Sequence, residues 1–223
     1  MQATHAIIEI TATCILQVLL QGAVYKMAET LEKEPTVGKP GAGLPFFEWF
    51  LAKYILLPGA YRKTGNEEAR RFFQAETDKI LALVNGIDAE KLTTRALIPR
   101  LRGLEDNSRY WSVAMVLEHL AIVGGGIKEA VIDLTRGGTD KKPVTIKDVK
   151  PDSKTPPEQC IQSFKAMSES FLLQIDPGAL DNHPEATYPH PWFGPMTARQ
   201  WYILAGRHQA IHRHQIEQIL SRL

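Results

Sequence analysis

The chain has 223 residues, with 26 Lys and Arg against 25 Asp and Glu and a formal net charge of +1. This length accommodates one sizeable domain, or a domain with an appended segment. The near-neutral balance, without a block of like charge, gives no electrostatic signature of binding to nucleic acid or to an acidic membrane. The two cysteines, Cys14 and Cys160, exclude a disulfide framework and a cysteine zinc ribbon, so we expect a reducing, cytoplasmic location.

The first helical pattern covers residues 4–33, and its part from 6 to 24 is rather apolar. Glu9, Gln17 and Gln21 interrupt this part, and no Lys or Arg precedes it. A signal peptide needs a basic start, and a membrane span needs about 20 residues with few polar breaks. The pattern therefore predicts a buried or partner-facing helix rather than a membrane anchor.

A loop rich in Gly and Pro follows over residues 35–45. The aromatic-rich segment 46–57 then forms a helical stretch that we expect to end at Pro58-Gly59. Its aromatic side chains are expected to pack in a core or to cover one end of the domain. These segments belong to a predicted N-terminal helical extension over residues 1–60, which precedes a bundle over residues 61–223.

Four longer segments in the bundle region carry apolar residues at helical spacing. They begin near Asn66, Ser112, Pro157 and Thr197, and the first three end near Asn85, Arg136 and Ile175. Residues 86–108 read as irregular and polar. Because no run of alternating β-branched residues is present and the last three helices are far apart, we predict an all-α, four-helix bundle with long crossover connections. Gly124-Gly125-Gly126, inside one helix, is expected to mark a kink or a close backbone contact.

The last helix carries His208, His212 and His214. Positions four apart lie on one side of a helix, so the first two imidazoles face the same way. His214 is about 200° around the axis from His212 and must face elsewhere. Two stacked imidazoles supply half of a transition-metal site. The alternative is a pair of solvated or core-edge histidines.

His119 is a lone histidine in an otherwise apolar helix, with Met115 one turn before it. Taken alone, it reads as a histidine at the edge of a core with one hydrogen bond. Together with His208 and His212 on a facing helix, it would complete a three-histidine site. Such a site leaves positions open for water or substrate, as catalytic zinc sites do.

These residues resemble the DinB/YfiT-like superfamily. The resemblance rests on Trp111-Ser112-x6-His119-Leu120 and on His208-x3-His212 in the last helix. The segment 190–197, His-Pro-Trp-Phe-Gly-Pro-Met-Thr, with Trp201 after it, is similar to a turn that precedes the last helix in an uncharacterised branch. The resemblance covers roughly residues 66–222 and implies a four-helix bundle with a three-histidine metal centre. That branch places its last-helix histidines at i, i+3 and i+4, so His208 and His212 carry over and His214 does not.

Other side chains are expected around this centre. Gln215 and Trp201 each lie seven positions from His208 and project toward the metal side, as support for the ligands or as pocket wall. His190 and Trp192, just before the last helix, could overhang the site, and Met115 is a further pocket candidate. Two sets are expected elsewhere: Glu118 as a solvated or structural acid, and His5 and His183 as exposed residues without partners.

The resemblance implies a divalent metal, and zinc, nickel and iron all suit imidazole ligands. Characterised relatives include thiol-dependent S-transferases and an isomerase, so we expect transfer or isomerisation of a small electrophile with a low-molecular-weight thiol as cosubstrate. A metal-dependent hydrolase is an alternative, although no carboxylate stands at a compelling spacing to act as general base. Another alternative is a non-catalytic metal-binding, interaction or stress-response protein that dimerises through its helices. In that case a fourth protein ligand would close the site, and His190 is the candidate. The expected partners are a small-molecule substrate and a second copy of the chain, with neither nucleic acid nor membrane.

Overall fold

The computed structural model describes residues 34–138 and 149–223, so the predicted helix over 4–33 lies outside the described residues. The helices are α2 (Phe46–Leu51), the π-helical η1 (Ala52–Leu56), α3 (Leu57–Lys63), α4 (Asn66–Val84), α5 (Ala89–Thr93), α6 (Val113–Leu134), α7 (Pro157–Gln174) and α8 (Ala198–Leu220). Two short 3-10 helices, η2 (Asp106–Arg109) and η4 (Pro177–Ala179), lie in the connections. The strands are β1 (Ala96–Leu97), β2 (Tyr110–Trp111), β3 (Tyr188–His190) and β4 (Gly194–Met196).

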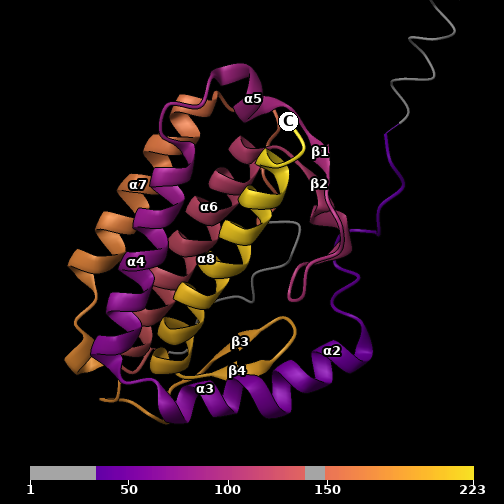
Figure 1. The fold of residues 1–223 in the computed structure, drawn as a ribbon. Helices are drawn as coiled ribbons and strands as arrows, with labels where there is room; N and C mark the ends of the chain where they lie inside the picture. The colour runs from indigo at the N-terminus through magenta and orange to yellow at the C-terminus, as the bar shows by residue number, and fades with distance from the viewer. Residues whose placement is uncertain (1–33, 139–148) are drawn as a thin grey trace, which may run out of the picture. The chain divides into compact units, whose positions relative to one another are not determined.

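Helices α4, α6, α7 and α8 pack side by side as a four-helix bundle, which confirms the predicted fold class (Figure 1). Helix α6 contacts both α7 and α8, and α4 contacts the same two helices. Stacked rings fill part of the interior: Phe171 lies 4.1 Å from Phe73 and 5.4 Å from Tyr202, measured between ring centroids. The apolar faces of the four helices thus meet in one interior, as the helical spacing of their apolar residues requires.

Polar side chains at the helix starts explain where α6 and α8 begin. The Ser112 hydroxyl accepts a hydrogen bond from the Met115 backbone at the start of α6. Thr197 forms a reciprocal capping box with Gln200 at the start of α8, so the predicted starts of both helices are confirmed. Helix α4 begins at Asn66, but its cap is Gly65 and not Asn66, the cap that the sequence favoured; the Asn66 side-chain amide instead donates to the Pro177 carbonyl.

The helix that begins at Phe46 does not end at Pro58-Gly59, as we expected, but continues to Lys63. In the π-helical turn the Leu57 backbone N–H bonds to the Ala52 carbonyl, five residues back. Proline has no N–H, and its ring clashes with the carbonyl four residues before it in an ordinary α-helix. The wider turn lets Pro58 enter the first turn of α3 without breaking the helix.

The aromatic side chains of α2 are not core residues, which corrects the first of the two expectations for this segment. Phe46, Phe47 and Phe50 are exposed, and α2 has no buried residue. Trp49 is half-buried, and its indole N–H donates to the Trp192 carbonyl at 2.7 Å. The helix is therefore attached to the bundle along one side only. The division at residue 60 stays a prediction.

Two antiparallel strand pairs lie in the long connections. In the region expected to be irregular, β1 pairs with β2, and the connection before α8 forms the β3–β4 hairpin, with His190 opposite Gly194. The expected close backbone contact occurs at Gly124, where an added Cβ would lie 2.4 Å from the Met167 sulfur on α7. Within the described residues, no helix is both long and apolar enough to cross a membrane.

Candidate metal centre

Helices α6 and α8 bring three histidine side chains together inside the bundle. His119 comes from α6, and His208 and His212 come from successive turns of α8. The Nε2 atom of His208 lies 3.2 Å from that of His212 and 3.4 Å from that of His119. One nitrogen from each ring lies within 4.8 Å of the other two. The three ligands named from the sequence therefore form one cluster.

Hydrogen bonds at the far side of two rings determine where their protons lie. His119 Nδ1 is 2.8 Å from the Val149 carbonyl oxygen, and His212 Nδ1 is 2.6 Å from the Gln215 side-chain oxygen. Both partners accept hydrogen bonds, so each Nδ1 carries the proton and donates. Each Nε2 is then unprotonated and directs its lone pair toward the centre of the cluster.

The spacing of the nitrogens fits a metal ion. Zinc–nitrogen bonds of about 2.0–2.1 Å in a tetrahedral site place neighbouring nitrogens about 3.3 Å apart. The separations of 3.2 and 3.4 Å at His208 agree with this value. The Nε2 atoms of His119 and His212 carry no proton, so the three nitrogens contain at most one hydrogen-bond donor, on His208, for two lone pairs. Hydrogen bonds among the three rings therefore cannot satisfy every nitrogen. The group could therefore hold a divalent cation.

Burial keeps these imidazoles neutral. Removal from water lowers the pKa of His119 to about 4 and that of His212 to about 3. The pKa of His208 is held well below its ordinary value by burial first and then by His212 and His119, which oppose a second positive charge. Neutral imidazole is the form that binds metal, so the cluster is in the ligand state at pH 7.

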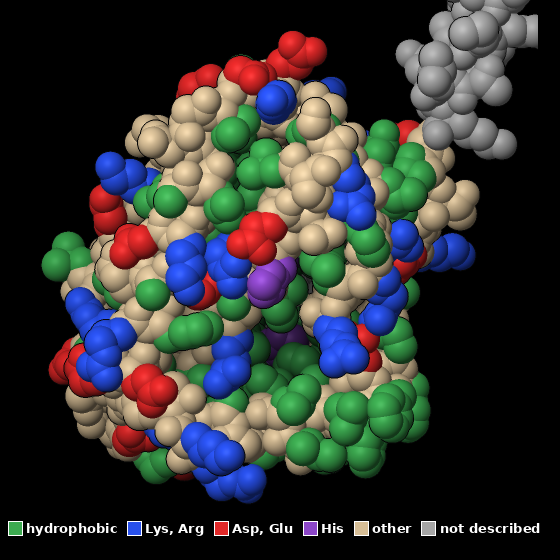
Figure 2. Space-filling model, in the orientation of Figure 1, with side chains coloured by type: hydrophobic (Ala, Val, Ile, Leu, Met, Phe, Trp, Pro, Cys, Tyr) green, Lys and Arg blue, Asp and Glu red, His purple; other side chains and the backbone are tan. Residues whose placement is uncertain are grey.

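Protein ligands do not surround the cluster on all sides. Among the residues that the structure describes, neither a carboxylate nor a fourth histidine joins the group. Figure 2 shows a hollow between α8 and the β3–β4 hairpin, with histidine and hydrophobic side chains at its floor. The described side chains thus supply three ligands, the number found in catalytic zinc sites that keep one position open.

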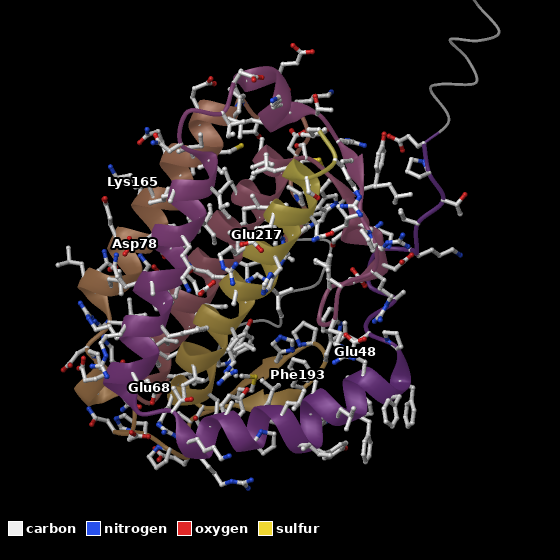
Figure 3. The ribbon with its side chains drawn as sticks, viewed as in Figure 1. Glu48, Glu68, Asp78, Lys165, Phe193 and Glu217 are labelled. Atoms are coloured by element: carbon white, nitrogen blue, oxygen red, sulfur yellow. The ribbon has the colours of Figure 1, made fainter. Side chains whose placement is uncertain are left out.

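The β3–β4 hairpin carries the predicted overhanging residues. The His190 ring lies 4.6 Å from the ring of Phe193 and 5.1 Å from that of Trp201. Phe193 is at the hairpin turn (Figure 3). Its Nδ1 accepts the backbone N–H of Trp192 at 3.1 Å, and burial lowers its pKa to about 4. His190 is close enough to His208 to disfavour charge on it. Trp201 supports this hairpin through an N–H bond to the Tyr188 carbonyl.

Other sequence candidates have mainly structural surroundings. Met115 is buried in the bundle core one turn before His119. Glu118 accepts a hydrogen bond from Thr155 at 2.6 Å and is half-buried, so its role is structural rather than solvated. His214 is exposed beside Glu217 and faces away from the cluster, as its position on the helix predicts.

Two expectations about isolated histidines have different outcomes. His183 was expected to be exposed without a partner, but it is half-buried and its Nδ1 lies 3.1 Å from a Glu185 carboxylate oxygen. This correction has a local cause, because the two residues are two positions apart in a tight turn. His5 lies outside the described residues.

Three groups that contact the histidines or their partners were not predicted from the sequence. The Val149 carbonyl and the Ser108 carbonyl, which accepts from Gln215, are backbone groups that no residue pattern reveals. The Trp111 ring lies 5.2 Å from the His119 ring and is parallel to that of His212 at 6.4 Å. Its position beside the cap of α6, in the Trp-Ser motif, was the available signal.

The chain is similar to a known protein family and to a solved structure. The family model described as the DinB superfamily matches residues 73–216, which is more than half of the chain and includes all three histidines. The crystal structure of TT2238, a four-helix bundle protein, is 22% identical and covers 68% of this chain and 96% of its own, with a TM-score of 0.44. No curated protein matches. The chain belongs to the DinB superfamily.

Proposed function

We propose that the protein binds a divalent metal ion through His119, His208 and His212 and uses it in transfer or isomerisation chemistry with a small thiol. The observation that carries the proposal is the convergence of three Nε2 atoms, two of which are held as lone-pair donors by hydrogen bonds at Nδ1. Zinc, nickel and iron(II) are the candidate ions, because all three accept imidazole ligands.

A bound divalent ion would supply a Lewis acid that favours the ionised form of a thiol at its open position. The rest of the site belongs to the chain. Gln215 and the Val149 carbonyl orient two of the ligands. His190 keeps its proton on Nε2, because its Nδ1 accepts a backbone N–H, and so offers a neutral hydrogen-bond donor to an electrophile's oxygen.

The proposed transfer forms one sulfur–carbon bond. The thiol gives its proton to solvent, the sulfur attacks an electrophilic carbon, and the leaving group departs with its bonding electron pair. In an isomerisation the thiol adds to the electrophile and is expelled again after bond rotation, so that it is regenerated. Neither reaction consumes an oxidant or a reductant.

Thiol chemistry fits the site better than hydrolysis does. A hydrolase needs a general base near the attacking water. No carboxylate of the described residues joins the histidine group, and Glu118, next to His119 in sequence, is hydrogen-bonded to Thr155. A thiol is far more acidic than water and ionises beside a cation without a separate base. For this reason we prefer thiol chemistry to hydrolysis.

Elemental analysis tests the metal site first. The protein is purified without a polyhistidine tag and without added metal, beside a His208→Ala/His212→Ala variant and a His214→Ala control. We expect near-stoichiometric metal in the parent and in the control, and none in the double variant. Absence of metal from all three, even after incubation with zinc, nickel or iron(II), would contradict the proposal.

A thiol-consumption assay then separates the catalytic and non-catalytic alternatives. Metal-loaded protein is mixed with a panel of low-molecular-weight thiols and a model electrophile, and loss of free thiol is followed. We expect a rate that chelation abolishes and that metal restores. Stoichiometric metal without any thiol consumption would favour the alternative of a non-catalytic metal-binding or interaction protein. A homodimer and a cytoplasmic location remain predictions alongside either outcome.

A further inference from the structure

The helix formed by α2, η1 and α3 has one strongly apolar exposed side. The described residues include eleven exposed large hydrophobic side chains, and six of them fall within residues 46–56. Phe46 is 76% exposed, Phe47 71% and Leu56 64%. We call these six residues the aromatic face: Phe46, Phe47, Phe50, Tyr54, Ile55 and Leu56. Exposed apolar clusters of this kind mark interaction sites in soluble folds.

The aromatic face is a defined surface, because the opposite side of the same helix is fixed to the bundle. Trp49 donates to the Trp192 carbonyl, and Leu57 and Ala60 are buried. Arg199 on α8 donates to the carbonyls of Tyr61 and Thr64 at 2.7 and 2.8 Å. The helix therefore has a fixed rotation about its own axis, with its aromatic side turned outward.

Contacts along the helix make the face continuous. The rings of Phe46 and Phe50 lie 6.4 Å apart, and those of Phe50 and Tyr54 lie 5.0 Å apart. The π-helical turn contains one residue more than an α-helical turn. Three consecutive residues are exposed in it: Tyr54, Ile55 and Leu56. Figure 2 shows hydrophobic side chains gathered at the lower right, over α2.

The charges of the same segment are almost all positive. Residues 46–63 contain Lys53, Arg62 and Lys63 against a single acid, Glu48. That acid is turned inward, where it binds Arg100 and the Gly103 backbone N–H (Figure 3). The Lys53 ammonium group lies over the Trp49 ring, 5.1 Å from its centroid. The near-zero charge of the whole chain, from which we expected no membrane partner, conceals this local positive surplus.

We propose that the aromatic face and its basic residues bind the surface of an anionic phospholipid bilayer. Phe, Tyr and Leu side chains would enter the boundary between headgroups and acyl chains, and Arg62 and Lys63 would pair with lipid phosphates. The helix would lie along the membrane surface and not cross it, because it carries Glu48, Lys53, Arg62 and Lys63 and is not apolar enough to span the bilayer.

Charge favours a bilayer over a second copy of the chain as the occupant. A two-fold interface would bring two copies of this basic segment together, without an exposed acid of residues 46–63 to neutralise them. Anionic headgroups complement the same charges. The proposal does not depend on the metal centre, since none of its residues belongs to the histidine cluster.

Vesicle flotation with the full chain tests the proposal. Vesicles of phosphatidylcholine alone are compared with an equimolar mixture of phosphatidylcholine and phosphatidylglycerol. We expect the parent to float with the anionic vesicles and to bind phosphatidylcholine more weakly. A Phe46→Ser/Phe47→Ser variant should lose at least about tenfold in affinity for the anionic vesicles, because two large apolar side chains no longer enter the bilayer.

Matched variants make the result specific. Leu173→Ser removes a side chain that is 86% exposed on α7 and does not belong to residues 46–63, so it should leave binding unchanged. Arg62→Gln/Lys63→Gln should weaken binding to anionic vesicles and reduce its salt dependence. Circular dichroism checks that every variant is folded. The proposal would be overturned if the parent failed to bind anionic vesicles, or if the Phe46→Ser/Phe47→Ser variant bound them equally well. It would also be overturned if the parent did not bind vesicles but formed a dimer that this variant disrupts and the other variants do not.

Discussion

Gln215 connects His212 to the loop that precedes α6. Its side-chain oxygen accepts a hydrogen bond from His212 Nδ1 at 2.6 Å, and its amide nitrogen donates to the Ser108 carbonyl at 2.7 Å. The second bond fixes which end of the amide faces the imidazole, since only the nitrogen can donate to a carbonyl. Gln215 thereby determines the tautomer of a proposed metal ligand without approaching the metal position itself.

Replacing Gln215 by Ala should weaken metal binding while leaving all three ligands in place. The expected loss of affinity is about 10–100-fold, because the His212 ring loses its orientation and its preferred tautomer. Competition with a chelator of known affinity measures it. Gln74→Ala, at an exposed position of α4, is the control. Equal affinities in the two variants would show that Gln215 has no part in the site.

The glycine triplet of α6 should respond unequally to alanine. A Cβ at Gly126 meets no atom within 4 Å, so Gly126→Ala should stabilise the protein by about 0.5–1 kcal/mol through helix propensity. A Cβ at Gly124 would lie 2.4 Å from the Met167 sulfur, so this gain should be lost to repacking. Chemical denaturation compares the two. An equal gain in the free energy of unfolding for the two variants would mean that α6 and α7 are not closely packed at Gly124.

Glu76 and Arg213 form an ion pair between α4 and α8. Arg213 Nε lies 2.6 Å from Glu76, which is 2% exposed and also bonds to Lys79 at 2.7 Å. Arg213→Met should destabilise the fold by about 3 kcal/mol, the low end for breaking a buried pair, because Lys79 remains. Arg71→Met, at an exposed position of α4, should have little effect. A similar loss in both variants would contradict a special role for the pair.

The same carboxylate predicts a pH dependence of stability. Burial raises the pKa of Glu76, but hydrogen bonds from Lys79 and Arg213 outweigh that effect and leave the pKa below its ordinary value of 4.5. The folded state therefore binds this proton less readily than the unfolded state. The stability difference between the parent and Glu76→Gln should be constant from neutral pH down to the ordinary pKa. It should shrink as pH falls further, through the folded pKa. Denaturation curves over this range measure it, and a difference that grows in acid would refute it.

Local helical spacing explains what the sequence could predict about the site. His208, His212 and Gln215 lie on one α-helix, so their relative directions follow from the period alone. His119 required the further assumption that α6 faces α8, which rested on a resemblance. The Val149 carbonyl bonded to His119 lies 30 residues further along the chain, and no local rule connects them.

The errors around α2 have a similar origin. Pro-Gly normally ends a helix, but a π-helical turn that accommodates Pro58 depends on how the helix docks against Trp192 and Arg199. Burial of the aromatic residues was expected from their hydrophobicity. Burial is decided by the surface available to cover them, and the buried apolar side chains of the bundle pack against one another. The Glu76–Arg213 pair was not predicted either, because its members are 137 positions apart and only the folded bundle brings them together.

The separation of His119 and His208 along the chain has a thermodynamic consequence. The two residues are 89 positions apart, so the complete ligand set is assembled only when the chain is folded. An ion that binds the folded chain and is released on unfolding stabilises it in proportion to the logarithm of the free-ion concentration. The lifetime of the protein against proteolysis would then follow the supply of that ion, and scarcity of metal would be registered as a lower abundance of the folded chain.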